Sequence, residues 1–314
     1  MKPWTFVHVA DIQPGSPRSY RYNPSWIRNW RQARAQILEI DPELMLVGGD
    51  LTRDGSIHRF ELQEIKADLD ALPFPVYVVP GNMDTGNKHT RKIGRHRGPD
   101  QCNDLDLNVT SVQLQQFASV FGPLWWSVEH KNVRFSGLAD MVVNSGLPEE
   151  TQFWQWAEEQ KNRPRPEHHV WITHYALFID DPDEPNRKID DPAEYREWYF
   201  SVDQPGRGRL LELFEATGAD IVISGHIHCH KVTYAMGIRF EIAPAPSFAQ
   251  MRDRWPDADP SLGFLRYDVK DTGIEATFIP LEKTYQLEGY GPGGHPAPHV
   301  RDCSRAWGAD DDLA

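Results

Sequence analysis

The most constraining feature of this chain is a repeated switch from an apolar run to a short polar cluster. In the first part of the chain, segments with strand character at 5–10, 44–47 and 76–79 alternate with amphipathic segments of helical period at 25–40 and 57–72. Parallel strands need a crossover connection, which usually carries a helix. This order therefore predicts βαβ units and a mainly parallel sheet.

Each of these three predicted strands runs directly into polar residues. In open α/β sheets, binding residues gather at the carboxyl ends of the strands. The polar clusters are Asp11 after the first strand, Gly49-Asp50 after the second and Gly81-Asn82-Met83-Asp84 after the third. We therefore expect a functional site at this edge of the sheet.

The rest of the chain repeats this pattern twice more. A predicted strand at 170–173 ends at His174, and another at 220–224 runs into the motif Gly225-His226-Ile227-His228. Further helices are expected near 112–120, 149–161 and 209–217. Further strands are expected at 125–128, 133–138, 231–235, 238–243, 264–269 and 274–279, so that the sheet finishes in antiparallel hairpins.

Two long polar stretches and the C-terminal region do not fit the alternation. We expect one domain over 1–283 with insertions at about 85–110 and 180–206, because connections of this length inside a domain are usually functional loops or disordered. The region 284–314 is rich in Gly and Pro and then acidic, which predicts a loosely attached tail.

Charge and cysteine content narrow the class of protein. A formal net charge of −13 disfavours nonspecific binding to nucleic acid or anionic membranes, whose phosphates repel an acidic surface. Three cysteines without a CxxC pair argue against a disulfide framework or a zinc knuckle. No apolar run reaches the roughly 20 residues of a membrane-spanning helix, and the first residues lack the pattern of a signal peptide. We expect a cytoplasmic protein with no membrane or nucleic-acid duplex partner.

The five polar clusters carry more meaning together than singly. A single Asp or Gly-Asn at a strand end is also typical of a helix cap or a turn, and a single His of a packed, hydrogen-bonded side chain. In this order, and all at strand ends, they supply carboxylate, amide and imidazole donors. That mixture suits Mn²⁺, Fe or Zn²⁺ better than Ca²⁺, which prefers oxygen alone.

The same series of motifs resembles that of the calcineurin-like metallophosphoesterases over most of 5–243. The resemblance implies an α/β fold, a four-layer α/β/β/α sandwich of two mixed sheets with the helices outside. It extends further to the branch with cyclic-nucleotide phosphodiesterases and small protein-phosphatase-like members, through an insertion that contains Tyr195, Trp198, Tyr199 and Phe200.

The resemblance also implies a centre of two divalent metal ions, which would be Mn, Fe or Zn. A hydroxide that bridges the two ions would attack the phosphorus of a phosphate ester in line, and the ions would stabilise the developing charge. The implied ligands are Asp11 and His228 for the first ion, Asn82, His174 and His226 for the second, and Asp50 as the bridge and a catalytic residue.

Two positions depart from the motifs of the family. Gln13 stands where the family usually has a histidine, so it is either a weak ligand of the first ion through its carbonyl oxygen or only a hydrogen-bonding residue. Met83 stands where a histidine assists the leaving group, a role that a thioether cannot fill. The partner of that histidine, Asp84, remains as either a catalytic residue or a turn residue.

A basic segment follows the third cluster. This segment is either a solvated polar loop or a lid over the site. In a lid, Arg91, Lys92 and Arg95 would bind the phosphate of the substrate. His89, or alternatively His96, would then supply the proton that Met83 cannot. The basic residues are Lys88, Arg91, Lys92, Arg95 and Arg97.

The sequence as a whole predicts a metal-dependent hydrolase of a phosphate ester, with a phosphorylated small molecule or other phosphoester as its substrate. A phosphodiester is favoured over a monoester because Met83 cannot assist a poor leaving group. The alternative is a catalytically silent metal-binding or regulatory protein, in which Gln13 and Met83 mark a decayed active site.

Overall fold

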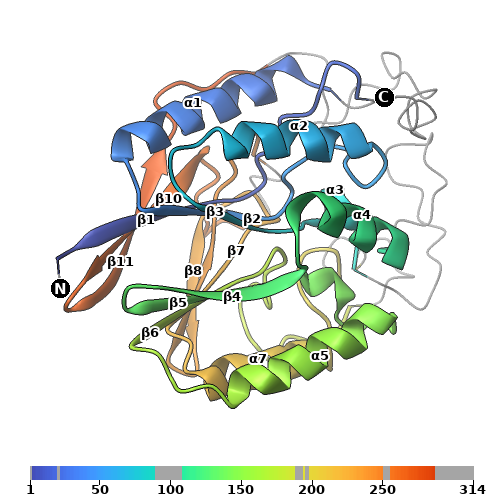
Figure 1. The fold of residues 1–314 in the computed structure, drawn as a ribbon, viewed down its shortest axis with the longest axis vertical. Coiled ribbons are helices and arrows are strands. Elements are labelled where there is room, and N and C mark those ends of the chain that lie inside the picture. Colours follow the sequence, from blue (N-terminus) through green and yellow to red (C-terminus); the bar gives the residue numbers. More distant parts are fainter. Residues whose placement is uncertain are drawn as a thin grey trace.

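Two mixed β-sheets packed face to face form the centre of the protein (Figure 1). The computed structural model describes residues 2–19, 22–88, 108–187, 194, 198–249 and 255–286. Helices cover the outer face of each sheet, so the layers run helix, sheet, sheet, helix. This arrangement confirms the predicted four-layer α/β/β/α sandwich.

The first sheet has the strand order β11-β10-β1-β2-β3. Strands β1, β2 and β3 run parallel, as the βαβ pattern predicts, and β10 and β11 extend the sheet as an antiparallel hairpin. The strands are β1 (Trp4–Val9), β2 (Leu44–Gly48), β3 (Val76–Val79), β10 (Gly263–Lys270) and β11 (Gly273–Pro280).

The second sheet has the strand order β4-β5-β6-β7-β9-β8. Its inner strands are parallel, and β4 and β8 pair antiparallel at the two edges. The predicted hairpins therefore divide between the sheets: β8 and β9 stay beside β7, whereas β10 and β11 return to β1. The strands are β4 (Trp125–His130), β5 (Val133–Leu138), β6 (His168–Ile172), β7 (Ile221–Ser224), β8 (Lys231–Ala235) and β9 (Ile238–Ile242).

Helices α1 (Pro24–Ile40) and α2 (Arg59–Asp70) cover the first sheet, and α5 (Pro148–Lys161) and α7 (Gly206–Thr217) cover the second (Figure 1). The Asn23 side chain caps α1 by accepting a hydrogen bond from the backbone N–H of Ser25 at 2.9 Å. Three shorter elements lie near the strand ends: α3 (Asn82–Thr85), α4 (Ser111–Phe121) and the 3₁₀ turn η1 (Asp140–Val142). None of the helices in the described ranges is both long and apolar enough to cross a membrane.

The layer between the sheets is an apolar core rich in aromatic rings. The ring of Phe6 on β1 lies 5.0 Å from the ring of Phe135 on β5, across the interface between the sheets. It also stacks on Tyr267 of β10, with the ring centroids 4.6 Å apart. All three side chains are fully buried. This core therefore fixes the separation of the sheets, and with it the separation of the loops at their ends.

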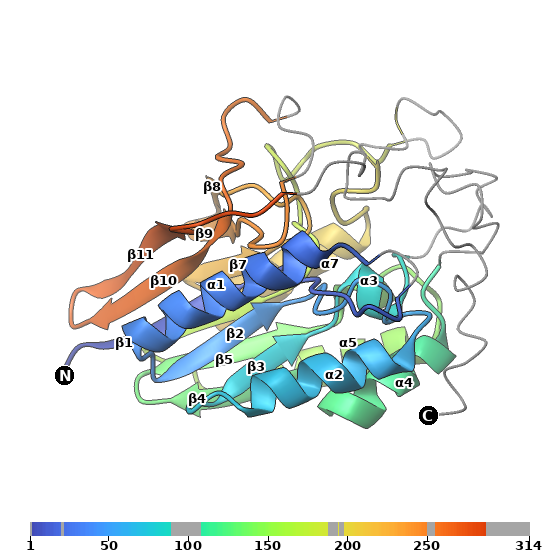
Figure 2. The same ribbon diagram turned by 90° about the horizontal axis from the view of Figure 1, so that it is seen from above.

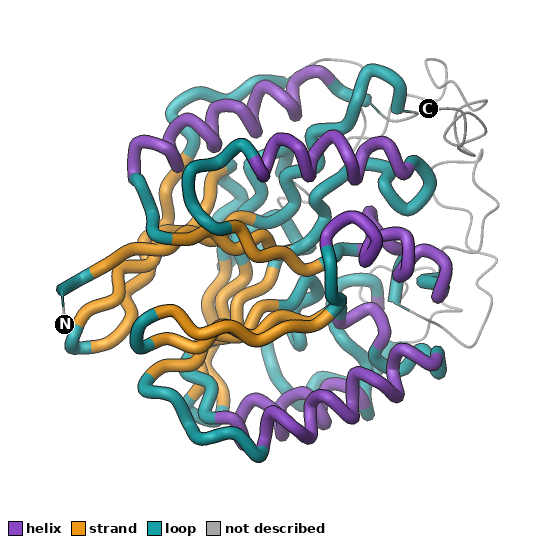
Figure 3. The backbone as a smooth tube through the Cα atoms, in the orientation of Figure 1, coloured by secondary structure: helices purple, strands orange, loops and turns teal. Residues whose placement is uncertain are grey.

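The carboxyl ends of β1, β2 and β3 lie at the end of the molecule away from the N-terminus, near α3 (Figure 2). The loops that follow them gather on the same side (Figure 3). The backbone N–H of Asp11 donates to the carbonyl of Gly49 at 3.0 Å, which joins the loops after β1 and β2. The backbone N–H of His226 donates to Asp11 Oδ2 at 2.8 Å and joins the two sheets at this edge.

Parts of the predicted organisation lie outside the described residues. These parts are 89–107 of the first insertion, most of 188–197 in the second, and the tail from 287 onward. The proposed division into one domain, two insertions and a tail stays a prediction. The expected polar cluster after β3 forms one helical turn, α3, because Asp84 accepts a hydrogen bond from the backbone N–H of Gly81 at 2.8 Å.

We expect Phe6→Ala to lower the free energy of unfolding by about 3–5 kcal/mol, the usual cost of truncating a buried aromatic side chain. Urea denaturation of the metal-free protein would measure this loss. Tyr234→Ala is the control: Tyr234 on β8 is 71% exposed, and truncation there should change stability by less than about 0.5 kcal/mol. Equal effects of the two substitutions would contradict the assignment of Phe6 to the core.

Candidate metal centre

The strand-end loops bring the predicted ligands together from both sheets. From the first sheet, Asp11 follows β1, Asp50 follows β2, and Asn82 begins α3 after β3. From the second sheet, His174 follows β6, and His226 and His228 follow β7. Every one of these side chains is buried, with at most 4% of its surface exposed.

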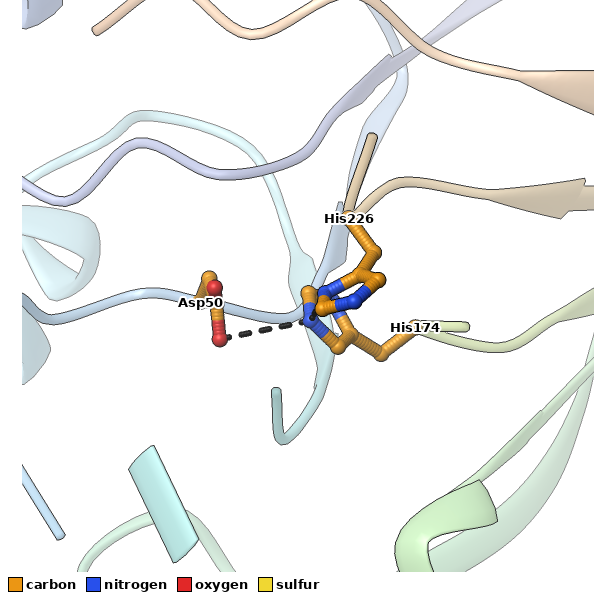
Figure 4. Close-up of side chains that lie close together, drawn as sticks. All are labelled: Asp50, His174 and His226. Atoms are coloured by element: carbon orange, nitrogen blue, oxygen red, sulfur yellow. Dashed lines mark hydrogen bonds and ion pairs between the residues drawn. The ribbon is translucent and has the colours of Figure 1, made fainter. Parts of the chain in front are cut away.

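One group of donor atoms surrounds the inner nitrogen of His174. His174 Nε2 lies 3.0 Å from Asn82 Oδ1, 3.3 Å from Asp50 Oδ1 and 3.1 Å from His226 Nδ1. Figure 4 shows the side chains of Asp50, His174 and His226 directed at a common point. This group could hold one metal ion.

Backbone carbonyls fix the orientation of both imidazoles in this group. His174 Nδ1 lies 2.9 Å from the carbonyl oxygen of Gly48, and His226 Nε2 lies 2.9 Å from that of Tyr199. A neutral imidazole that donates its proton outward presents a lone pair on the inner nitrogen. Four lone-pair donors then face one another, an arrangement that a bound cation stabilises.

A second group lies next to the first and shares Asp50. His228 Nε2 is 3.2 Å from Asp11 Oδ1, and the other nitrogen, Nδ1, is 2.7 Å from the carbonyl oxygen of Phe248. Apart from this contact with each other, His228 Nε2 and Asp11 Oδ1 are fully buried and have no hydrogen-bond partner within the described residues. Such atoms are costly to bury, and a cation held by Asp11, Asp50 and His228 would satisfy them. The donor set therefore fits two cations with Asp50 between them.

Two glycines allow the ligands to approach this closely. A Cβ atom at Gly81 would lie 2.1 Å from the Asp50 carboxylate, and one at Gly225 would lie 2.5 Å from Asp11 Oδ2. Both distances are far shorter than a real contact allows. The Gly-Asn and Gly-His pairs are therefore required by packing of the carboxylates from neighbouring loops.

The backbone is strained where it carries the predicted ligands. Five of the nine non-glycine residues with positive φ in the described part of the chain are Asp11, Gln13, Asp50, His226 and His228. Each such conformation costs on the order of 1–3 kcal/mol and persists only where the surroundings enforce it. At His226 and His228 it breaks the alternation of a strand, so that both imidazoles reach the centre.

The electrostatics of the centre favour uptake of positive charge. Burial raises the pKa of Asp50 well above its usual value, and the carboxylates of Asp11 and Asp84 raise it further. Burial also acts to raise the pKa of Asp11, but the adjacent His228 lowers it below its usual value. Burial lowers the pKa of His226, and so does His174 beside it. Without metal, these shifts therefore favour the protonated carboxyl of Asp50 and the neutral imidazole of His226.

Gln13 faces this centre with its amide nitrogen. Its Nε2 donates to Asp50 Oδ2 at 2.7 Å, while its Oε1 accepts a hydrogen bond from Arg53 Nη1 at 3.0 Å. The guanidinium of Arg53 lies 5.0 Å from the ring of Trp26 and is buried. In this arrangement Gln13 orients Asp50, and its role as a metal ligand stays a prediction.

Asp84 braces the loops around the centre. Its carboxylate accepts hydrogen bonds from the backbone N–H groups of Leu51, Thr52 and Gly81 and from the Thr52 hydroxyl. These contacts are those of a positioning residue, and the catalytic role predicted for Asp84 stays a prediction. The predicted residues His89, Arg91, Lys92 and Arg95 lie outside the described residues.

Lys88, the first of the basic residues, is buried rather than solvated. Its side chain is 5% exposed, and its Nζ donates to the carbonyl of Ser201 at 2.6 Å and lies 3.2 Å from Asp203. Burial lowers the pKa of Lys88 to about 8, although Asp203 opposes this. Lys88 thus joins the loop after Asn82 to the second insertion.

Sequence reasoning missed two residues that support the ligands. Asp140, directly after β5, accepts hydrogen bonds from the backbone N–H groups of His174 at 3.3 Å and Tyr175 at 2.8 Å. Its position just after a strand is the same sequence signal that located the other clusters, so this signal could have identified Asp140. The hydroxyl of Tyr199 accepts a hydrogen bond from Asn82 Nδ2 at 2.8 Å. No local signal marks that contact, because it depends on the path of the second insertion.

Two facing mixed sheets with a shared carboxylate between two mixed-donor groups define the class of dinuclear metallohydrolases. Comparison with known families agrees: the family described as calcineurin-like phosphoesterase matches residues 5–230. The chain belongs to this family of metal-dependent phosphoesterases.

Two relatives and one solved structure are similar to this chain. The serine/threonine-protein phosphatase CPPED1 of Danio rerio is 27% identical over 260 residues, which cover 73% of this chain and 72% of that protein. The probable glycerophosphodiester phosphodiesterase GpdQ of Arcobacter nitrofigilis is 25% identical over 249 residues, with 76% and 77% covered. The purple acid phosphatase PPD1 of yellow lupin (Lupinus luteus) shares the fold, with a TM-score of 0.60, 16% identity, and 91% of this chain and 53% of that chain covered.

The shared carboxylate leads to a prediction about metal content. After reconstitution with Mn²⁺, we expect two metal ions per wild-type chain, and Asp50→Ala should lose both because each donor group includes Asp50. Elemental analysis after desalting would measure this. Asp70→Asn is the matched control, since Asp70 is an exposed carboxylate paired with Lys66 on α2. Retention of both ions by Asp50→Ala would contradict the bridging arrangement.

The raised pKa of Asp50 leads to a second prediction. Because the pKa of Asp50 is raised, protons compete with the metal for its carboxylate, so the affinity for Mn²⁺ should fall as the pH is lowered through that raised pKa. The lowered pKa of His226 means that this imidazole stays neutral and does not compete. Isothermal titration in buffers of different ionisation enthalpy would count the protons released. An affinity independent of pH, with no proton release, would contradict this account.

Proposed function

We propose that this chain hydrolyses a phosphate ester at a centre of two divalent cations of Mn, Fe or Zn. The observation that supports this most strongly is the pair of buried donor groups that share Asp50, each with its ligand atoms within 4.8 Å of one another. In the proposed centre Asp50 is the bridge, Asp11 and His228 hold the first cation, and Asn82, His174 and His226 hold the second.

Bound there, the cations would activate a water molecule for in-line attack on phosphorus and stabilise the charge that develops on the phosphate oxygens. The protein itself orients the ligand atoms and buries them. The carbonyls of Gly48, Tyr199 and Phe248 hold the outer nitrogens of the three imidazoles. Such outer hydrogen bonds fix the tautomer and raise the basicity of the ligating nitrogen.

A phosphodiester is the favoured substrate. Met83 carries a thioether beside Asn82, and a thioether cannot donate a proton to a poor leaving group. The proposed source of that proton is His89, with Arg91, Lys92 and Arg95 as the residues that bind phosphate. One relative is named as a protein phosphatase and the other as a glycerophosphodiester phosphodiesterase, so the relatives do not favour one type of ester. The preference for a phosphodiester therefore rests on Met83.

Hydrolysis of generic aryl substrates tests the proposal. We expect Mn²⁺-loaded wild-type protein to cleave an aryl phosphodiester with higher kcat/KM than the matching monoester. His228→Ala should reduce that rate by at least about 10²-fold, because it removes a ligand of the first cation. His130→Ala is the control, since His130 on β4 pairs with Glu43 away from the centre. A metal-loaded protein inactive on both substrates would favour the silent metal-binding alternative.

A further inference from the structure

The second insertion contacts two of the proposed metal ligands through Tyr199. The hydroxyl of Tyr199 lies 2.8 Å from Asn82 Nδ2, and its backbone carbonyl lies 2.9 Å from His226 Nε2. The ring of Tyr199 packs on the imidazole of His226, with the ring centroids 4.8 Å apart. Tyr199 therefore contacts two of the ligands of the proposed second cation at once.

We infer that Tyr199 is a positioning residue of the metal centre, which selects the end of the Asn82 amide that faces the cation. This inference rests on the proposed function, because it concerns the affinity for the second cation. Only the oxygen of a carboxamide can bind a cation; the nitrogen carries two hydrogens and no available lone pair. A rotation of the amide by half a turn would therefore abolish ligation by Asn82.

The hydrogen bonds of the amide decide between its two orientations. In the observed orientation Oδ1 is directed at His174 and Nδ2 donates to the hydroxyl of Tyr199. Among the described residues, the other hydrogen-bond contact of Nδ2 is the sulfur of Met83 at 3.4 Å, which is a weak acceptor. The hydroxyl of Tyr199 is thus the strong acceptor that keeps the oxygen of Asn82 on the metal side.

Buried contacts hold Tyr199 in this place. The neighbouring carbonyl of Ser201 accepts a hydrogen bond from Lys88, and Phe200 packs edge-on against Trp255 with the ring centroids 5.0 Å apart. Lys88 also donates its backbone N–H to the Tyr175 hydroxyl at 3.2 Å. Because Lys88 lies six residues after Asn82, one set of contacts fixes both the ligand and the hydroxyl that orients it.

Tyr199→Phe in the full-length chain tests this role, because it removes the acceptor and keeps the ring and the backbone carbonyl. Titration of metal-free protein with Mn²⁺ should show one site weakened by about 10–100-fold and the other unchanged, the usual cost of losing an outer hydrogen bond to a ligand. Tyr234→Phe, at an exposed position on β8, should leave both affinities unchanged. Thermal unfolding of the metal-free variants would show that each one folds.

A double-mutant cycle separates positioning from a general structural effect. In an Asn82→Ala background the amide is absent, so Tyr199→Phe should weaken metal binding no further. The inference is overturned if Tyr199→Phe binds both ions as tightly as the wild type, or if it causes the same loss in the Asn82→Ala background. A wild-type chain that binds no Mn²⁺ would overturn the proposed function itself, which is a different outcome from either of these.

Discussion

The buried carboxylate of Asp50 is the constraint on which the rest of this structure depends. A carboxylate at 2% exposure is costly to bury unless hydrogen bonds or cations compensate it. Gln13 Nε2 and the backbone N–H of Met83 both donate to it, at 2.7 and 2.8 Å. Gly81 leaves room for it, since any side chain there would overlap the carboxylate. Cations held by the two donor groups that share Asp50 would compensate the negative charge that these hydrogen bonds leave.

The two sheets contribute unequal chemistry to the centre. Of the proposed ligands, the first sheet supplies the oxygen donors Asp11, Asp50 and Asn82, and the second supplies the imidazoles. The centre therefore exists only where the sheets meet, and the apolar core between them sets the distance across it. Packing energy from that core also supports the strained, positive-φ backbone at the ligands. The packing that stabilises the sandwich therefore also determines the geometry of the centre.

The two departures from the family's motifs have different physical consequences. At Gln13 an amide takes the place of an imidazole: it accepts a hydrogen bond from the buried Arg53 and donates one to Asp50, so a cationic side chain supports the carboxylate proposed as the bridge. At Met83 the thioether removes a proton donor but leaves the backbone N–H in contact with Asp50. In the proposed mechanism, the first change alters how the centre is held, whereas the second alters which leaving groups it can serve.

The sequence by itself determined the alternation of strands and helices and the polar clusters at the strand ends, whereas the two mixed sheets and the ligand set were implied by the resemblance to a known family. Apolar periodicity and the Gly-polar pairs that end each strand are local signals, so they can be read without coordinates. Only the tertiary structure decided that Gln13 turns its oxygen to Arg53, that Lys88 is buried, and that the Tyr199 hydroxyl accepts a hydrogen bond from Asn82. Those contacts join residues 40 and 117 positions apart in the chain, and they depend on the path of loops that no local pattern specifies.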